Sequence, residues 1–478
     1  MGFKNKDIVK FCDRIKEILF LPCCEIITSM NTSFEQPRPL QEGDVLTVWG
    51  GEPLKGEICV RGAKNFVSKA MVASLLAPGE SMVQNVPDIK DVRVVSDLLR
   101  LHGAKTEVDK EAGTVKIDAS SISVADIADV HTLAGSSRIP ILFAGPLLQR
   151  LGRAFIPSLG GDQIGKRPVD FHLSILKQLG AEITENENGS IELKAPHGLK
   201  GAMIHLPYPS VGATEQALLT SVEAEGKTEI SGAAIEPEIM DLVAVLQRMG
   251  ALIAVDVDRT IRVNGVESLQ PFTFKAQTDR IEVASWASAA LATKGDIFIR
   301  GAQQSTMMTY LNVYRKIGGK FDVHDDGIRF WHPGGDLNPI ALETDVHPGF
   351  MTDWQPPLVC ALTQAKGLSI VHETVYENRF GFTDTLVKMG AVIQLYSECL
   401  GSLPCRFGHR GFVHSAVIFG PTPLHGADID IPDIRGGFSH VIGALVAEGQ
   451  SRIHGISLID RGYENFRKKL EALGARIN

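Results

Sequence analysis

Residues 279–299 read DRIEVASWASAALATKGDIFI, and this stretch contains the pattern from which the fold can be inferred. Asp279 opens an apolar run of helical length that closes on Gly295, and a stretch rich in β-branched and aromatic residues follows at once. A glycine directly after such a run is a helix stop signal, and the following residue types favour a strand. The segment therefore predicts a buried helix, a turn and a strand.

The same pattern recurs along the chain. The runs extend from Lys64 to Gly79, Arg138 to Gly152, Ser210 to Gly226, Asp279 to Gly295, Asp353 to Gly367 and Asp433 to Gly449. A second series of helix-like segments alternates with the first, each ending in a turn centred on Gly103, Gly180, Gly250, Gly318, Gly390 or Gly474. The period of about 70 to 80 residues exceeds the roughly 20 to 50 residues of solenoid repeats. We therefore predict a pseudo-symmetric α/β protein with two domains, each built from three repeated α/β units.

Composition limits the class of protein. The chain has 478 residues, 44% of them hydrophobic and 22% charged, which is typical of a soluble globular protein. A net charge of -8 argues against a protein that coats nucleic acid, although local arginines can still bind a small anion. The 7 cysteines lack zinc-finger spacing and are expected to be reduced thiols of a cytoplasmic protein. We expect a monomer or weak oligomer with no membrane or nucleic-acid partner.

The first residues look separate from the repeats, which begin near Leu46. Residues 1–42 are expected to be a poorly ordered appendage, and Met30 is an alternative start to Met1. This part contains neither a long apolar span nor a clear secretory cleavage site. The expected domains are residues 64–277 and residues 43–63 plus 278–478, with Lys64 and Asp279 at the hinge of an inter-domain cleft.

The helix starts carry most of the candidate chemistry. Helix N-termini present unpaired N–H groups and a partial positive charge, and Lys64, Arg138 and Arg435 add full charges at three of them. Together they favour a ligand rich in phosphate. The alternative interpretation is ordinary capping of each helix by its own Ser or Asp.

Residues 157–172, PSLGGDQIGKRPVDFH, contain the sharpest local signal. The segment resembles a P-loop, but Arg167 stands where a magnesium-binding Ser or Thr is needed. A better interpretation places Pro168 in the first turn of a helix and makes residues 157–168 a mobile lid that holds one carboxylate, Asp162. The sequence shows no metal motif, and His172, His372 and His440 are expected to be structural.

Several motifs are spread from about Leu46 to the C-terminus, namely RGAK64N, GGD162QIGKR167PVD, S210VGAT, E236PE, TD353, ENR379F, D433IR and IDR461GY. Together they closely resemble the UDP-N-acetylglucosamine enolpyruvyltransferase family of the enolpyruvylshikimate-phosphate synthase superfamily. The resemblance implies an inside-out α/β barrel fold in two domains. It also implies transfer of the enolpyruvyl group of phosphoenolpyruvate to the sugar 3-hydroxyl, through a tetrahedral adduct that expels phosphate, without metal or organic cofactor.

The resemblance also implies roles for individual residues. Phosphoenolpyruvate would be held by Lys64, Asn65, Arg167, Arg435 and Arg461, with Arg379 close by. UDP-N-acetylglucosamine would contact Arg138, Arg167, Pro168, Val169, Asp170, Phe171, Ser210, Val211, Gly212, Asp279, Asp353 and Val375. The catalytic residues would be Lys64, Asp353 as the base for the sugar hydroxyl, and Asp162.

The chain departs from many members of the family at Asp162, where they carry the cysteine that fosfomycin alkylates. The sequence therefore predicts insensitivity to fosfomycin. Asp162 is expected either to donate the proton to the methylene carbon or to be a lid residue only, because an aspartate with a reference pKa of about 3.9 is ordinarily ionised at neutral pH. Tyr208 and Leu458 also depart from the family pattern. Two alternatives remain: an enolpyruvyltransferase for another acceptor, such as shikimate 3-phosphate, and a non-catalytic paralogue that binds a UDP-sugar.

Overall fold

The computed structural model describes residues 44–125, 130, 137–159, 169–403, 405–408 and 410–478. The expected appendage and both candidate start residues lie outside this part of the chain. In the described residues, no helix is long and apolar enough to cross a membrane.

The predicted repeat is present in the structure. Helices of the first series, which follow the six apolar runs, are α2 (Lys64–Ala73), α5 (Ala144–Leu151), α7 (Val211–Ser221), α9 (Arg280–Ala292), α11 (Gln355–Leu362) and α13 (Ile434–Val446). Helices of the second series are α3 (Lys90–Leu101), α6 (Asp170–Gln178), α8 (Pro237–Arg248), α10 (Met308–Ile317), α12 (Thr383–Lys388) and α14 (Phe466–Ala472). The glycines that end the second series all have positive φ, as a left-handed helix stop requires.

Some helices are shorter than the runs that predicted them. The first run changes from α2 to a 3₁₀ turn at Ser74–Leu76, and the second run begins with a 3₁₀ turn at Ile139–Phe143. Pro140 lies in that turn, and Pro356 and Pro357 lie at the start of α11. Proline lacks an N–H donor and is compatible only with the first turn of an α-helix, which explains why these helices begin late.

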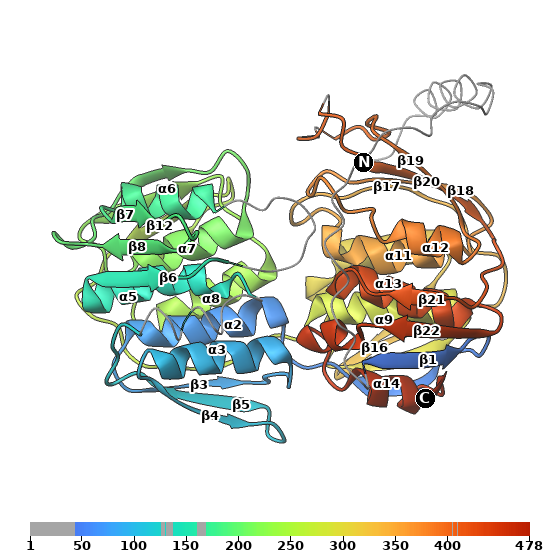
Figure 1. Cartoon of the computed structure of the whole chain (residues 1–478), viewed down its shortest axis with the longest axis horizontal. Coiled ribbons are helices and arrows are strands. Elements are labelled where there is room, and N and C mark those ends of the chain that lie inside the picture. The colour runs from blue at the N-terminus through green and yellow to red at the C-terminus, as the bar shows by residue number, and fades with distance from the viewer. Residues whose placement is uncertain (1–43, 126–129, 131–136, 160–168, 404, 409) are drawn as a thin grey trace. The chain divides into compact units, whose positions relative to one another are not determined.

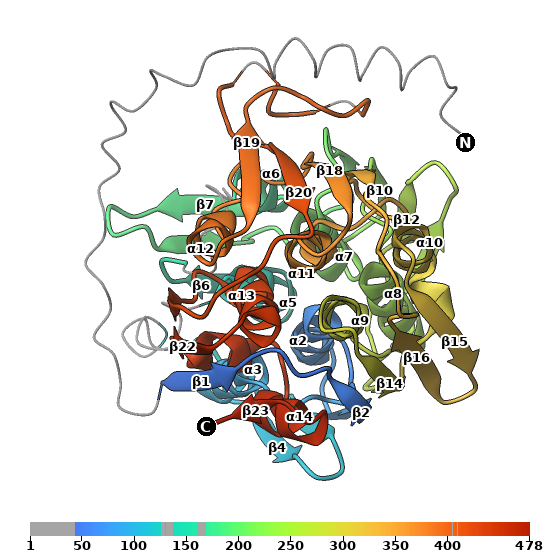
Figure 2. The same cartoon turned by 90° about the vertical axis from the view of Figure 1, so that its right-hand side faces the viewer.

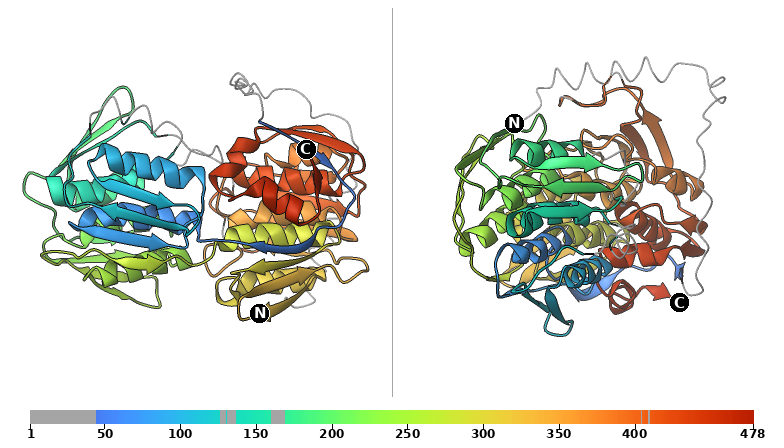
Figure 3. Two further views of the ribbon diagram at one scale, coloured as in Figure 1. Left: turned by 90° about the horizontal axis from the view of Figure 1, so that it is seen from below. Right: turned by 60° about the vertical axis from the view of Figure 1, so that its left-hand side comes forward.

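The first half of the repeats contains three sheets. Their strand orders are β13-β3-β5-β4, β6-β8-β7 and β11-β12-β10-β9. The strands are β3 (Glu80–Gln84), β4 (Lys105–Asp109), β5 (Thr114–Asp118), β6 (Arg153–Ile156), β7 (Glu182–Glu185), β8 (Ile191–Lys194), β9 (Met203–His205), β10 (Lys227–Ser231), β11 (Leu252–Val255), β12 (Ile261–Asn264) and β13 (Thr273–Lys275). Figure 3 shows the blue strands of the first sheet against α2 and α3, in agreement with the contacts between these elements.

The second half also contains three sheets. Their orders are β15-β16-β14-β2, β17-β18-β20-β19 and β21-β22-β1-β23. The strands are β1 (Val45–Trp49), β2 (Lys55–Cys59), β14 (Asp296–Arg300), β15 (Lys320–His324), β16 (Gly327–Trp331), β17 (Ala341–Glu343), β18 (Gly367–His372), β19 (Val392–Tyr396), β20 (Ser415–Gly420), β21 (Asp428–Asp430), β22 (Gln450–His454) and β23 (Arg476–Ile477). Figure 2 shows β18, β20 and β19 side by side, next to α11 and α12.

The core of the second half is helical. Helices α9, α11 and α13 pack on one another, and Figure 1 shows them with strands outside them. Every residue of α9 is buried, and so is every residue of α13 except Val446. A helix that is apolar on all sides must be enclosed, so the sheets have to cover these helices rather than pack on one another. This is the inside-out arrangement that the family resemblance implied.

The buried hydrophobic residues form two clusters. One extends from Ala63 to Ala276. The other combines residues 46–60 with residues 281–473. The strands β1 and β2 therefore belong to the core of the second half although they come first in the sequence, with β2 pairing in parallel with β14.

Candidate active site

The two chain segments that pass between the core clusters, just before α2 and just before α9, run side by side. Gly62 and Thr278 form an antiparallel bridge, and the N–H of Asp279 donates to the carbonyl of Arg61 at 2.8 Å. The starts of helices α2 and α9 are therefore brought to the same place, one at the beginning of each core.

Asp279 connects these two helix starts. Its Oδ1 accepts from the N–H groups of Ile281 at 2.8 Å and Glu282 at 3.2 Å, which caps α9. Its Oδ2 accepts from the N–H of Lys64 at 3.2 Å, which satisfies the first N–H of α2. Asp279 is buried, and its carboxylate accepts from three backbone N–H groups, so it holds the two helix ends together.

Lys64 and Arg461 share one carboxylate, Asp91. The Nζ of Lys64 lies 3.0 Å from Oδ2 of Asp91, and the Nε of Arg461 lies 3.3 Å from Oδ1. Burial raises the pKa of Asp91, but the charges of Lys64 and Arg461 outweigh burial, and the net shift is downward. Two of the cations predicted to bind phosphoenolpyruvate are thus adjacent, and Asn65 follows Lys64 in the first turn of α2.

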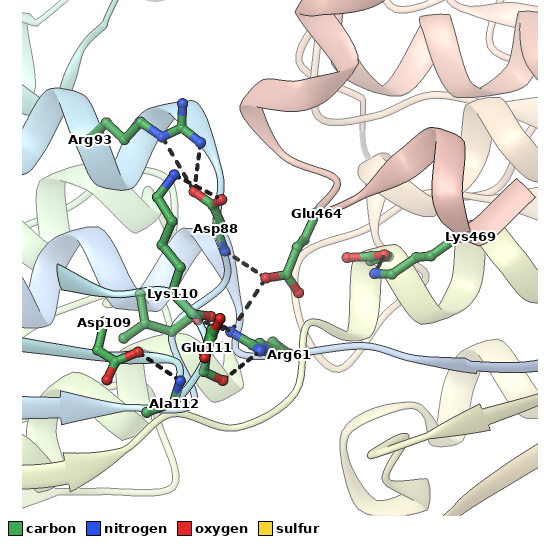
Figure 4. A network of polar contacts seen from close by, with 11 residues as sticks. Arg61, Asp88, Arg93, Asp109, Lys110, Glu111, Ala112, Glu464 and Lys469 are labelled. Carbon is green, nitrogen blue, oxygen red and sulfur yellow. Dashed lines mark hydrogen bonds and ion pairs between the residues drawn. The ribbon is translucent and has the colours of Figure 1, made fainter.

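Figure 4 shows a further polar network, centred on Asp88 just before α3. Glu464, from the second half, accepts from the N–H of Asp88 at 2.8 Å and lies 3.5 Å from Nη1 of Arg61. Asp88 in turn pairs with Arg93 and Lys110. These bonds hold the segment before α3 against the segment before α14. Asp91 lies in the first turn of α3, directly after the held segment.

A second group of charges lies at the starts of α11 and α13. Asp353 accepts from Nη2 of Arg379 at 2.7 Å. Asp433 caps α13 by accepting from the N–H groups of Arg435 at 2.9 Å and Gly436 at 3.0 Å, and it lies 3.9 Å from Nη1 of Arg379. The buried Arg379 side chain therefore ties the predicted base to the cap of α13.

Among the predicted phosphoenolpyruvate ligands that the structure describes, Arg435 is the most enclosed. Its residue is 6% exposed, and its guanidinium stacks over the ring of Tyr463 at 5.0 Å. Burial lowers the pKa of Arg435, but the nearby Tyr463, Asp279 and Asp353 raise it by more, so the group stays charged. Its Nη1 is buried and has no hydrogen-bond partner among the described residues. A buried, charged donor without a partner is costly, and an anionic ligand would satisfy it.

Glu373 organises the segment around Asp353. The buried Glu373 carboxylate accepts from Oγ1 of Thr352 at 3.0 Å and from the N–H groups of Val375 at 2.8 Å and Tyr376 at 3.0 Å. This bond network places Val375, a predicted UDP-sugar contact, beside the turn that carries Asp353.

The predicted uridine segments meet at the starts of α6 and α7. Ser210 caps α7 by accepting from the N–H of Ala213 at 3.4 Å. His172 of α6 lies 3.3 Å from Oε1 of Gln216 and against Gly212, where an added Cβ would be 3.1 Å from its ring. Burial lowers the pKa of His172 to about 4. The neutral histidine thus packs between the two helices. The remaining predicted contacts here are Val169, Asp170, Phe171 and Val211, which all lie in or next to these helix starts.

Three predicted residues lie outside the described part of the chain, namely Asp162, Arg167 and Pro168. The described helix after them, α6, begins at Asp170. Arg138 lies at the start of the 3₁₀ turn before α5, and it acts electrostatically on His172 of α6.

Sequence reasoning missed Asp91, Glu373 and Arg406. Asp91 looks like an ordinary acid in the first turn of a helix, and Glu373 like an acid at the end of a strand. Arg406 places its guanidinium 3.9 Å from the centre of the Tyr208 ring and donates to the carbonyl of Val375 at 2.5 Å. The one sequence signal near Arg406 is that Tyr208 departs from the family pattern.

Comparison with known proteins identifies relatives over nearly the whole chain. Residues 48–470 match the family model described as EPSP synthase (3-phosphoshikimate 1-carboxyvinyltransferase). A protein of Protochlamydia amoebophila named UDP-N-acetylglucosamine 1-carboxyvinyltransferase is 49% identical over 91% of this chain and 94% of its own length. A protein of the same name from Chlamydia trachomatis serovar D is 46% identical over 90% of this chain and 97% of its own.

Solved structures share the architecture. The enolpyruvyl transferase NikO from Streptomyces tendae superimposes with a TM-score of 0.80 at 24% identity, over 91% of this chain and 98% of that chain. EPSP synthase from Acinetobacter baumannii superimposes with a TM-score of 0.70 at 19% identity, over 91% of this chain and 99% of that chain. At these identities the likeness shows the fold alone, and it confirms the predicted fold class.

Proposed function

Because the chain belongs to the EPSP synthase family, we propose that it transfers the enolpyruvyl group of phosphoenolpyruvate to the 3-hydroxyl of UDP-N-acetylglucosamine and releases phosphate. This is the first committed step of peptidoglycan precursor synthesis. The acceptor follows from the relatives at 49% and 46% identity, which carry the name UDP-N-acetylglucosamine 1-carboxyvinyltransferase.

The observation that carries the proposal is the enclosed cation Arg435, whose buried Nη1 has no hydrogen-bond partner among the described residues. Lys64 and Arg461 lie together at the carboxylate of Asp91 and add two further cations. Phosphoenolpyruvate carries a phosphate and a carboxylate, and planar guanidinium groups bind both kinds of anion well. We assign phosphoenolpyruvate to Lys64, Asn65, Arg435 and Arg461, with Arg167 as a further ligand.

The proposed chemistry is addition followed by elimination. Asp353 takes the proton of the sugar 3-hydroxyl, and the oxygen attacks C2 of phosphoenolpyruvate while an acid protonates C3. The resulting tetrahedral adduct loses a proton from C3 and expels phosphate, which restores the double bond. Arg379 holds Asp353 through a 2.7 Å hydrogen bond, which orients the carboxylate for its role. We assign the acid role to Asp162.

Lys64 and the arginines have a second role in this scheme. Negative charge increases on the departing phosphate, and fixed cations in a partly buried site stabilise such charge without reorganising. Burial of Lys64 and Arg461 to 16% and 12% side-chain exposure supports this, since it limits screening by water.

We place UDP-N-acetylglucosamine across the starts of α6 and α7, with Arg138, Arg167, Pro168, Val169, Asp170, Phe171, Ser210, Val211, Gly212, Asp279, Asp353 and Val375 as its contacts. The active site then lies between two domains, residues 64–277 and residues 43–63 plus 278–478. The two separate hydrophobic clusters support this division.

The test is phosphate release from phosphoenolpyruvate by the full chain with UDP-N-acetylglucosamine, from about pH 5 to about pH 9. The proposal predicts release that depends on the UDP-sugar. Activity that is lost in Asp162→Asn supports Asp162 as the acid, whereas retained activity moves the proton donor to another group. Release with shikimate 3-phosphate in place of the UDP-sugar would refute the acceptor, and no release with either would refute the enzyme and favour a non-catalytic paralogue.

A further inference from the structure

Two cysteines and two histidines gather at one end of the sheet β17-β18-β20-β19, and none of them is among the residues assigned above. Cys399 and Cys405 lie in the loop between β19 and β20, His414 precedes β20, and His372 ends β18. One side-chain ligand atom of each residue lies within 4.8 Å of those of the other three. The grouping is not visible in the sequence, because three of the residues lie in the loop between β19 and β20 and the fourth, His372, ends β18.

The sheet itself positions the two histidines. The N–H of Glu373, which follows His372, donates to the carbonyl of His414 at 2.8 Å, and the two imidazole centres are 5.4 Å apart. The Nε2 of His414 lies 3.3 Å from Sγ of Cys399. The pairing of β18 with β20 therefore holds both rings toward the same point.

Each histidine has its second ring nitrogen engaged by an acceptor. The Nδ1 of His414 lies 2.7 Å from the carbonyl oxygen of Phe412, which can only accept, so Nδ1 carries the proton and Nε2 carries the lone pair. The Nδ1 of His372 lies 3.3 Å from Oε2 of Glu343. Histidines that bind metal typically donate their other N–H to a carbonyl or a carboxylate, and these two contacts fit that arrangement.

The Nε2 atom of His372 is buried without a hydrogen-bond partner among the described residues. The whole residue has 0% exposure. Buried polar atoms in native proteins almost always have a partner, so an ordinary core histidine does not account for this nitrogen.

We propose that Cys399, Cys405, His372 and His414 bind one zinc ion in a tetrahedral site. Two thiolates with two imidazoles are a usual donor set for structural zinc, with distances of about 2.3 Å to sulfur and about 2.0 Å to nitrogen. Tetrahedral geometry then separates the ligand atoms by about 3.3 to 3.8 Å. The 3.3 Å between Cys399 and His414 is within this range. Binding releases the two thiol protons, and the two thiolate charges balance the ion.

The loop is built around this site. Glu343 also accepts from the N–H groups of Ser402 at 2.9 Å and Leu403 at 2.8 Å, and the N–H of Phe407 donates to Sγ of Cys405 at 3.3 Å. A Cβ at Gly401 would lie 2.2 Å from Nδ1 of His372, so only glycine allows the loop to approach this closely.

The zinc ion anchors the part of the loop that carries Arg406. Arg406 follows Cys405 directly, donates to the carbonyl of Val375 and stacks on Tyr208. Fixing Cys405 thus keeps the Arg406 guanidinium in contact with Tyr208 of the first half and Val375 of the second half. The metal has a structural role here and takes no part in the reaction proposed above.

The test measures zinc binding by the full chain. The chain is purified with a thiol reductant, loaded with Zn²⁺ alone and passed through a desalting column, and its metal content is measured by mass spectrometry. The parent and the control Cys59→Ser, which alters an exposed thiol outside the cluster, are expected to retain one zinc ion per chain. Cys399→Ser and Cys405→Ser are expected to retain at least tenfold less. Far-ultraviolet circular dichroism confirms that each variant is folded.

Cobalt provides a second readout that does not depend on activity. Co²⁺ in place of zinc is expected to show thiolate-to-cobalt charge-transfer absorption in the parent and in Cys59→Ser, and to lose it in Cys399→Ser. Absence of stoichiometric zinc in the reduced parent, or unchanged zinc in both serine variants, would overturn the site. A disulfide between Cys399 and Cys405 that persists in the reductant would also overturn it. None of these results bears on phosphate release, so the two proposals fail separately.

Discussion

Replacing Glu238 by glutamine removes one partner of a buried ion pair that joins the two core clusters. Glu238 lies in α8 of the first half, and Arg280 begins α9 of the second. The pair is bidentate, with Nε to Oε1 at 2.9 Å and Nη2 to Oε2 at 3.0 Å. Arg280 is 2% exposed and also lies 5.2 Å above the ring of Trp354. Glu238→Gln keeps the shape of the side chain and removes its charge.

The expected loss is large because a charge remains buried. Removing one partner of a buried pair costs about 3 to 5 kcal/mol, since the other ion keeps its desolvation penalty. Glu236 and Asp279 also lie close enough to raise the pKa of Arg280, so they retain part of the compensation. We therefore expect the lower end of the range, about 3 kcal/mol of unfolding free energy.

The assay is urea denaturation followed by tryptophan fluorescence, with Glu229→Gln as the control. Glu229 pairs with Arg262 at 2.9 Å, but the Arg262 side chain is 52% exposed and that of Glu229 33% exposed, and water screens such pairs. The control is expected to leave the unfolding midpoint almost unchanged. If Glu238→Gln shifts the midpoint no more than Glu229→Gln does, the buried pair does not stabilise the fold as argued.

The same pair predicts a pH dependence. Burial raises the pKa of Glu238, but the Arg280 charge and hydrogen bonds outweigh it and hold the pKa below its ordinary value. A lowered folded-state pKa contributes stability above the unfolded-state pKa of about 4.3, and this contribution is lost as the pH falls through the folded-state value. The difference between the parent and Glu238→Gln should therefore be constant above about pH 5 and shrink at lower pH.

Three further predictions concern the proposed site. Asp353→Asn should abolish phosphate release while UDP-N-acetylglucosamine binding, measured by calorimetry, survives; loss of binding instead would make Asp353 a positioning residue only. Asp279→Ala leaves three backbone N–H groups without their acceptor and should cost about 2 to 4 kcal/mol in urea denaturation, whereas Asp279→Asn keeps an acceptor and should cost less. Equal losses in the two variants would contradict the capping argument. The parent should resist fosfomycin in the phosphate-release assay and Asp162→Cys should become sensitive, since only a thiol is alkylated; irreversible inactivation of the parent would refute this.

Local sequence signals were sufficient for the repeat. The apolar runs and their terminal glycines predicted helices of both series because helix periodicity and left-handed stop residues act over a few residues. Capping by Ser210, Asp279 and Asp433 was also visible, since a cap bonds to N–H groups two or three residues ahead. The prolines at the start of α11 are an equally local signal, and they account for a helix that begins after Asp353.

The partners of the predicted site residues depended on tertiary structure. Asp91 joins Lys64 to Arg461, and these residues are brought together from distant repeats only by the packing of α3 near the C-terminal segment. Asp279 also accepts from the N–H of Lys64. This bond requires the segments before α2 and α9 to lie side by side, as the bridge between Gly62 and Thr278 shows. No periodicity or motif encodes such a contact.

The amino-acid sequence by itself thus determined the helices, the turns, the sixfold repeat and, through its motifs, the family. The tertiary structure alone decided which charges share a carboxylate, which buried nitrogen lacks a partner, and that His372 and His414 meet Cys399 and Cys405. The physical reason is the separation in the chain over which each interaction acts. Propensity, capping and periodicity act between residues that are near neighbours in the chain. Ion pairs and metal ligation depend on the distance in space between residues that are far apart in the chain.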